Sequence, residues 1–164
     1  KQKDHFTLLK AVKNLKNKNN LKLILIGYGS LFLKIKNYIK INNLNDIVEI
    51  HTNVKDVAKF YSRTDLFILS SLYEGFPNVL VEAAQYNIPI ISTNCNSGPR
   101  EILSNGKGGE LLATKDYLTM SKKIELFLKN EKPFIKKANF CKKNLYRFNN
   151  KHNLMKFENF FDKL

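Results

Sequence analysis

The sequence has few residues that could form covalent or metal cross-links, and it has no long apolar run. Its two cysteines, Cys95 and Cys141, have a spacing that suits neither a disulfide framework nor a zinc site. The three histidines show no metal-ligand spacing, so we expect neither a metal nor another cofactor. No segment is apolar over the length of a membrane span, and the first residues do not form a secretory signal. We therefore expect a cytoplasmic location.

Acidic residues are also scarce. Fourteen Asp and Glu residues stand against 28 Lys and Arg residues, which gives a net charge of +14. Such an excess suits nucleic acid or an anionic membrane surface as a partner. However, Asn and Ile are abundant beside Lys, as an AT-rich genome would encode, and lysine most often occupies solvated faces. We interpret the charge mainly as compositional. We expect no nucleic-acid partner and, at most, peripheral association with the cytoplasmic face of an inner membrane.

The hydrophobic pattern alternates between short apolar runs and segments with helical periodicity. The length of 164 residues suits one domain. Because buried strands that alternate with helices form parallel βαβ units, the pattern predicts an α/β fold, a Rossmann-like parallel sheet with helices on both faces. The chain starts in a helical segment with no strand before it, so we expect its beginning to be cut. Strands are predicted at 21–27, 47–50, 66–70, 88–93 and 108–112; helices at 3–20 (capped by Asp4), 30–39 (capped by Ser30), 54–63, 77–86, 101–103 and 116–130, with one or two lysine-rich helices in 132–164.

A ligand site is expected where the predicted strands end. In a parallel sheet, ligands bind outside the carboxyl ends of the strands. The loops at these ends are 27–29, 51–53, 71–78 and 93–101.

The segment from Ser70 to Ala83 carries the clearest chemistry. Glu74 lies in the loop after a predicted buried strand, and Glu82 lies about one turn into the next helix. Gly75 lets a ligand approach the backbone, and Pro77 favours helix entry. The first amides of the helix are expected to be unpaired and to favour an anion such as a diphosphate. Two carboxylates beside an anion site indicate that sugar hydroxyls are also bound.

These residues resemble the E-x7-E motif of glycosyltransferase family 4, whose members have the GT-B fold. The resemblance covers roughly residues 1–128, in order and at the expected intervals. Its other parts are Lys3 to Ala11, the strand that ends in Gly27-Tyr28-Gly29, Val48 to Val54, and Ser97 to Ile102. The last of these loops has a form associated with bacterial capsule, lipopolysaccharide and lipid-linked oligosaccharide transferases. The resemblance implies that residues 1–164 are the nucleotide-sugar-binding half of a GT-B enzyme, with the N-terminal acceptor-binding domain absent from the chain.

The resemblance also implies roles for individual residues. Glu82 would hold the ribose of the nucleotide, Glu74 would lie by the donor sugar, and Lys3 would meet the diphosphate. The implied enzyme is retaining, needs no metal, and transfers a hexose or N-acetylhexosamine from a nucleotide sugar, which we expect to be UDP-linked, to a glycan or lipid-linked acceptor. The isolated chain would be inactive. The remaining donor-binding residues would be Gly29 in the first loop, Asn53 and Val54 by the base, and the backbone around Gly75, Phe76, Asn78 and Val79.

Two alternative functions compete with this interpretation. The first is a non-catalytic nucleotide-binding Rossmann-like module. The second is a dehydrogenase-type domain, which is disfavoured because Gly27-Tyr28-Gly29 is followed by Leu31 and Phe32, where the dinucleotide fingerprint needs its third glycine. The family commonly has a glycine at the position of Thr52. The loop that is expected to contact the base therefore departs from the family's pattern at this position.

Overall fold

The computed structural model describes residues 1–148 and has the predicted alternation of strands and helices. Each predicted element up to residue 143 is present, most of them with shorter bounds. The strand predicted at 47–50 is shifted by one residue to 48–51, and the helix predicted at 101–103 spans 99–102. The part of the last lysine-rich segment from 149 to 164 lies outside the described residues. The strands are β1 (Leu23–Ile26), β2 (Val48–His51), β3 (Phe67–Leu69), β4 (Ile90–Thr93) and β5 (Glu110–Leu112). The helices are α1 (His5–Lys13), α2 (Phe32–Ile41), α3 (Ala58–Tyr61), α4 (Asn78–Gln85), α5 (Pro99–Ile102), α6 (Tyr117–Lys129) and α7 (Lys132–Lys143), with 3₁₀ turns η1 (Ser104–Gly106) and η2 (Leu145–Phe148).

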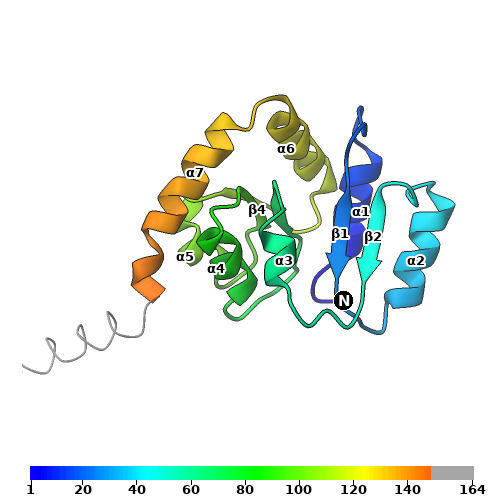
Figure 1. Ribbon diagram of the computed structural model, residues 1–164, viewed down its shortest axis with the longest axis horizontal. Helices are drawn as coiled ribbons and strands as arrows, with labels where there is room; N and C mark the ends of the chain where they lie inside the picture. Colours follow the sequence, from blue (N-terminus) through cyan, green and yellow to red (C-terminus); the bar gives the residue numbers. More distant parts are fainter. Residues whose placement is uncertain (149–164) are drawn as a thin grey trace, which may run out of the picture.

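All strand pairs are parallel, and they form two sheets. β1 pairs with β2, and β3, β4 and β5 follow one another in the second sheet. In Figure 1 the β1–β2 pair lies beside α1 and α2, while α4, α5 and α7 lie beside the second sheet. Within each sheet the carboxyl ends of the strands therefore lie at one edge, as the parallel pattern predicts.

The two faces of β4 show that helices cover both sides of its sheet. Ile91 packs into a core cluster built with α1 and α6, whereas its neighbour Ile90 packs into a second cluster with α4 and α5. Successive side chains of a strand point to opposite faces, so these two clusters lie on opposite sides of the strand. The prediction of a Rossmann-like α/β fold is confirmed. β1 departs from the predicted full burial, because Ile26 at its carboxyl end is 36% exposed.

Two predicted helix caps are wrong. The side chain of Asp4 accepts no backbone amide of α1; its carboxylate accepts a hydrogen bond from the Thr7 hydroxyl at 2.6 Å, and its backbone is left-handed with φ 38°. Ser30 is not a cap either, because α2 begins at Phe32, whose amide donates to the Gly29 carbonyl at 2.9 Å. In both places a local turn satisfies the groups that a capping side chain would otherwise bond.

Candidate functional site

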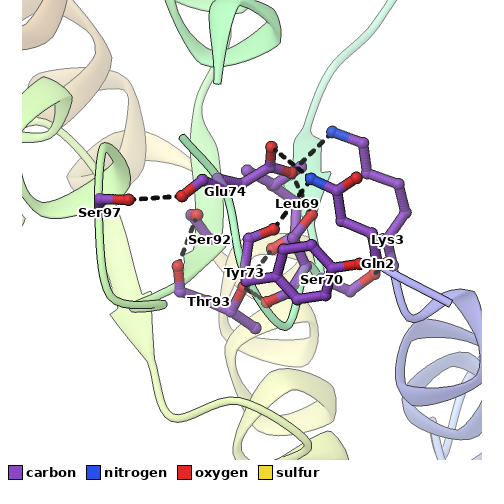
Figure 2. Close-up of polar contacts among 10 residues, drawn as sticks. Gln2, Lys3, Leu69, Ser70, Tyr73, Glu74, Ser92, Thr93 and Ser97 are labelled. Carbon is purple, nitrogen blue, oxygen red and sulfur yellow. Dashed lines mark hydrogen bonds and ion pairs between the residues drawn. The ribbon is translucent and has the colours of Figure 1, made fainter. Parts of the chain in front are cut away.

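Gln2 and Lys3 are fixed to the loop that follows β3. The Leu72 amide donates to the Gln2 carbonyl at 2.9 Å, and the Ser70 hydroxyl donates to the Lys3 carbonyl at 2.7 Å. The side-chain amide of Gln2 donates to the Tyr73 carbonyl at 3.1 Å. Figure 2 shows Gln2, Lys3, Ser70 and Tyr73 close to Glu74. The segment before α1 is thereby held at the carboxyl end of β3, about 70 residues away in sequence.

Glu74 is the centre of this network. Its side chain is only 6% exposed, and its Oε1 accepts from Lys3 Nζ at 2.7 Å and from the Ser71 hydroxyl at 2.5 Å. Its Oε2 lies 3.3 Å from the Gln2 side-chain nitrogen. The structure thus joins the two residues that the sequence analysis placed at the reaction centre. Lys3 keeps a side chain that is 43% exposed, so an anion can still reach its ammonium group.

The loop that carries Glu74 is supported from the β4–α5 side. The Ser97 hydroxyl donates to the Glu74 carbonyl. Gly98 has φ +86°, and a Cβ there would lie 2.2 Å from Pro77 Cδ and 2.8 Å from the Gly75 carbonyl oxygen. Only glycine fits such a backbone at such a contact. Gly75, by contrast, has no atom within 4 Å of the place of a Cβ, which leaves room for a ligand against its backbone.

Glu82 lies on α4 and contacts a different partner. The hydroxyl of Tyr61, the last residue of α3, donates to Glu82 Oε2 at 2.9 Å. Within residues 1–148 the carboxylate has no other hydrogen bond and no ion pair. Its Oε1 is therefore available to a ligand.

The start of α4 differs in detail from the expectation. The Asn78 amide donates to the Phe76 carbonyl at 3.0 Å, so the predicted unpaired amide is wrong at this position. The tight turn at Pro77 brings the two groups together. Asn78 is exposed, Val79 is half-buried, and the half-exposed Phe76 ring packs edge-on against Phe148 at 5.4 Å.

A cavity of about 370 Å³ opens between the segment before α1 and the loop after β1. Its lining includes Lys3 and Gly29, so these two predicted residues share one space. The loop after β2 lies beside it, because the Gly27 amide donates to the His51 carbonyl at 2.9 Å. That loop carries Asn53, exposed and left-handed with φ 56°, and the half-buried Val54. Glu74, Glu82, Asn53 and Val54 do not line the cavity itself.

Burial and neighbouring charges shift the pKa of two groups near the site. Burial, reinforced by Lys3, lowers the pKa of His5, so its imidazole stays neutral at neutral pH. Burial and then the negative charge of Glu74 raise the pKa of Cys95, which keeps its thiol protonated. Cys95 is itself buried.

Sequence reasoning missed the residues that hold the two glutamates. Gln2 and Ser71 donate to Glu74, and Tyr61 donates to Glu82. Ser71 offered a signal, since a hydroxyl three residues before a loop carboxylate can bond it within one turn. Gln2 and Tyr61 offered none, because their contacts span 72 and 21 residues.

Two further properties concern the part of the chain that the structure describes. Within 1–148, no three His, Cys, Asp or Glu side chains form a group that could hold a metal ion. In the same range, no helix has the length and apolar character needed to cross a membrane.

The comparison with protein families gives one match along residues 1–148, to the family described as "Glycosyl transferases group 1". Among curated proteins, an uncharacterized glycosyltransferase of Methanocaldococcus jannaschii is 41% identical over 103 residues, which are 62% of this chain and 25% of that protein. The first three curated relatives are matched over only 25%, 29% and 32% of their own lengths. The chain therefore corresponds to about a quarter to a third of these proteins.

Solved structures share the fold. The lipopolysaccharide outer core galactosyltransferase WaaB in its apo form has a TM-score of 0.84 and 26% identity, and the match covers 100% of this chain and 46% of that chain. A mutant of S. aureus TarM, solved in a complex that includes UDP, has a TM-score of 0.87 and 23% identity, with 98% of this chain and 33% of that chain covered.

Proposed function

The chain belongs to the group 1 glycosyl transferases, and we propose that it is the donor-binding domain of a retaining enzyme of glycosyltransferase family 4. The donor would be a nucleotide sugar, UDP-linked, that carries a hexose or an N-acetylhexosamine. The observation that carries the proposal is the arrangement of Lys3, Glu74 and Glu82 around the loop between β3 and α4, beside the open backbone of Gly75.

Each of the three side chains has a distinct task in this proposal. Lys3, whose ammonium group is partly exposed, would bind the diphosphate. Glu82, with Oε1 open, would accept hydrogen bonds from the ribose hydroxyls. Glu74, fixed by three donors, would face the donor sugar. The base would lie by Asn53 and Val54, in the loop adjoining the cavity that Gly29 and Lys3 line.

The chemistry would be electrostatic. When the bond between the anomeric carbon and the diphosphate breaks, its electron pair goes to the leaving phosphate oxygen. A fixed ammonium group and backbone amides stabilise that charge without reorganisation. In this scheme Lys3 and the amides around Gly75, Phe76 and Val79 act in place of a metal ion, and no cofactor takes part.

The acceptor would be bound by another domain. The matched curated relatives are three to four times as long as the aligned part, and WaaB by its name acts on lipopolysaccharide. We therefore propose a glycan or lipid-linked acceptor of bacterial surface polysaccharide, held by an N-terminal domain outside these residues. The enzyme would work in the cytoplasm, at the inner face of the membrane that carries such acceptors. These 164 residues alone would bind the donor and transfer no sugar, because transfer needs both reactants held together.

Substitution of the two glutamates tests the division of tasks. We expect Glu82→Ala to weaken the binding of UDP by about tenfold to a hundredfold, because a charge-assisted hydrogen bond contributes about 1.5–3 kcal/mol. Glu74→Ala should not weaken the binding of UDP, since it removes a negative charge beside Lys3. It should weaken the binding of a UDP-sugar. Calorimetry with UDP, UDP-glucose and UDP-N-acetylglucosamine measures these affinities.

Glu125→Ala is the matched control, because this half-buried glutamate of α6 lies in a different part of the fold and accepts a hydrogen bond from the Lys16 amide. Circular dichroism establishes that each variant is folded. Unchanged UDP affinity in Glu82→Ala would contradict the proposed donor site. Equal losses for UDP and UDP-sugars in Glu74→Ala would contradict the role of Glu74 in sugar binding.

A further inference from the structure

The side chain of Tyr61 is tightly packed, although Tyr61 is the last residue of a four-residue helix. Its side chain is buried, at 8% exposure. The Tyr86 ring stacks on it with centroids 5.5 Å apart and planes at 23°, and the Phe67 ring lies at 5.9 Å. Two aromatic neighbours therefore fix the direction in which the phenol oxygen points.

Within residues 1–148, that oxygen has one hydrogen-bond partner. The hydroxyl donates to Glu82 Oε2 at 2.9 Å, from α3 across to α4. Burial and then the hydrogen bond to Glu82 raise the pKa of Tyr61, so the phenol remains a donor at every physiological pH. A phenol that donates to one carboxylate oxygen fixes the plane of the carboxylate and leaves the other oxygen, Oε1, for a second donor.

We infer that Tyr61 is a positioning residue that orients Glu82 toward the two hydroxyls of a ribose, so that the site selects ribonucleotides over 2′-deoxyribonucleotides. The inference rests on the proposed function, because it assumes that Glu82 meets the nucleotide. Tyr61 itself touches no ligand in this arrangement. A glutamate side chain alone has three rotatable bonds, and the phenol removes much of this freedom before the nucleotide arrives.

The test compares ribose and deoxyribose ligands across matched variants. Calorimetry of the whole 164-residue chain with UDP and with 2′-deoxy-UDP gives an affinity ratio for each variant. We expect the unsubstituted chain to prefer UDP about tenfold, the contribution of one charge-assisted hydrogen bond. Tyr61→Phe keeps both ring contacts and removes only the hydroxyl. It should weaken the binding of UDP about three- to tenfold and that of 2′-deoxy-UDP less, because 2′-deoxy-UDP keeps only one of the two hydroxyls, and so reduce the preference.

Tyr86→Phe is the control, because the Tyr86 ring stacks on Tyr61 while its hydroxyl donates no hydrogen bond to the Glu82 carboxylate. This variant should keep the preference for UDP over 2′-deoxy-UDP. Tyr61→Phe in a Glu82→Ala background should have no further effect on the ratio, since the two residues act through one contact. Thermal unfolding of each variant separates lost folding from lost positioning.

The outcomes separate the two proposals. A Tyr61→Phe variant that keeps the full preference, or that loses affinity for both ligands equally, overturns the positioning role while the donor site stands. No UDP binding by the unsubstituted chain, or no effect of Glu82→Ala on UDP, overturns the donor site and the positioning role together.

Discussion

Lys3 Nζ lies 2.7 Å from Glu74 Oε1, so neither charged group would face a nucleotide sugar without a partner. A buried carboxylate beside a diphosphate would repel it, and an unpaired ammonium group would be free to move. Paired, the carboxylate is neutralised and the ammonium group is held at the edge of the cavity. The ion pair is also coupled to Gln2 and Ser71, which supply the remaining donors to Glu74. Loss of one partner would leave a charge buried without compensation.

A substitution at Lys3 tests its proposed contact with the diphosphate. Lys3→Met should weaken UDP about tenfold or more and leave uridine binding nearly unchanged, because only UDP carries the phosphates that a lysine would meet. Paired titrations with UDP and uridine measure this difference. Lys13→Met is the matched control, since Lys13 lies exposed at the end of α1. Equal losses for uridine and UDP in Lys3→Met would argue against a phosphate contact. They would indicate instead that Glu74, left unpaired, disturbs the loop.

At this scale, sequence reasoning succeeded where chemistry is local and failed where it is not. The sequence predicted that Glu74 lies in a loop and Glu82 in a helix, because Pro77 and Asn78 mark the start of α4 between them. The contact from Tyr61 was not predictable, since it joins residues 21 positions apart on two helices that β3 separates in the sequence. The side-chain cap expected at Asp4 is an exception, because it failed although the contact that replaces it is local. Nothing in the sequence distinguishes an acceptor of the Thr7 hydroxyl from an acceptor of a helix amide.

Among the elements, strand and helix order was predictable because most apolar runs are short and bounded by polar or turn-forming residues. The β4 run is buried on both faces, as a continuous apolar segment predicts. β1 looked the same in sequence, yet Ile26 is 36% exposed where the strand opens into the cavity. Exposure at a strand end depends on what covers that end, which the strand's own residues do not encode. The division of the strands into a two-stranded and a three-stranded sheet was equally unpredictable from the sequence.

The contact between the β3–α4 and β4–α5 loops gives a prediction about stability. Gly98→Ala should destabilise the fold by about 2–4 kcal/mol, because its methyl group would overlap Pro77 and the Gly75 carbonyl in a left-handed backbone. Gly106→Ala is the matched control. Gly106 has a similar φ of +89° but no atom within 4 Å of the added methyl, so it should lose only about 1 kcal/mol. Urea unfolding followed by circular dichroism measures both. Equal losses would show that backbone strain alone, and not the contact between the loops, requires glycine at Gly98.

At the scale of the whole molecule, the net charge of +14 is the main property that the motifs do not explain. The lysines of α6 and α7 divide into two groups. Lys123 and Lys137 both pair with Glu110 on β5, at 2.7 and 2.5 Å, and so tie the two helices to the sheet. Although burial alone would raise the pKa of Glu110, these two lysines hold it below its usual value. The lysines that remain exposed on these helices are Lys122, Lys129, Lys132, Lys136, Lys142 and Lys143.

These exposed lysines lead to a prediction about membrane binding. If they are mainly compositional, the chain should bind phosphatidylglycerol vesicles only through unspecific attraction, worth about 1 kcal/mol for each lysine near the surface. Such attraction weakens once salt shortens the screening length to about 8 Å at physiological ionic strength. We therefore expect sedimentation with anionic vesicles at low salt, release at physiological salt, and no binding to phosphatidylcholine vesicles. Lys136→Glu with Lys143→Glu should reduce the low-salt binding no more than Lys34→Glu with Lys40→Glu on α2, since all four lysines are exposed. Retention on anionic vesicles at physiological salt, lost only in the α7 variant, would instead identify α7 as a membrane-binding surface.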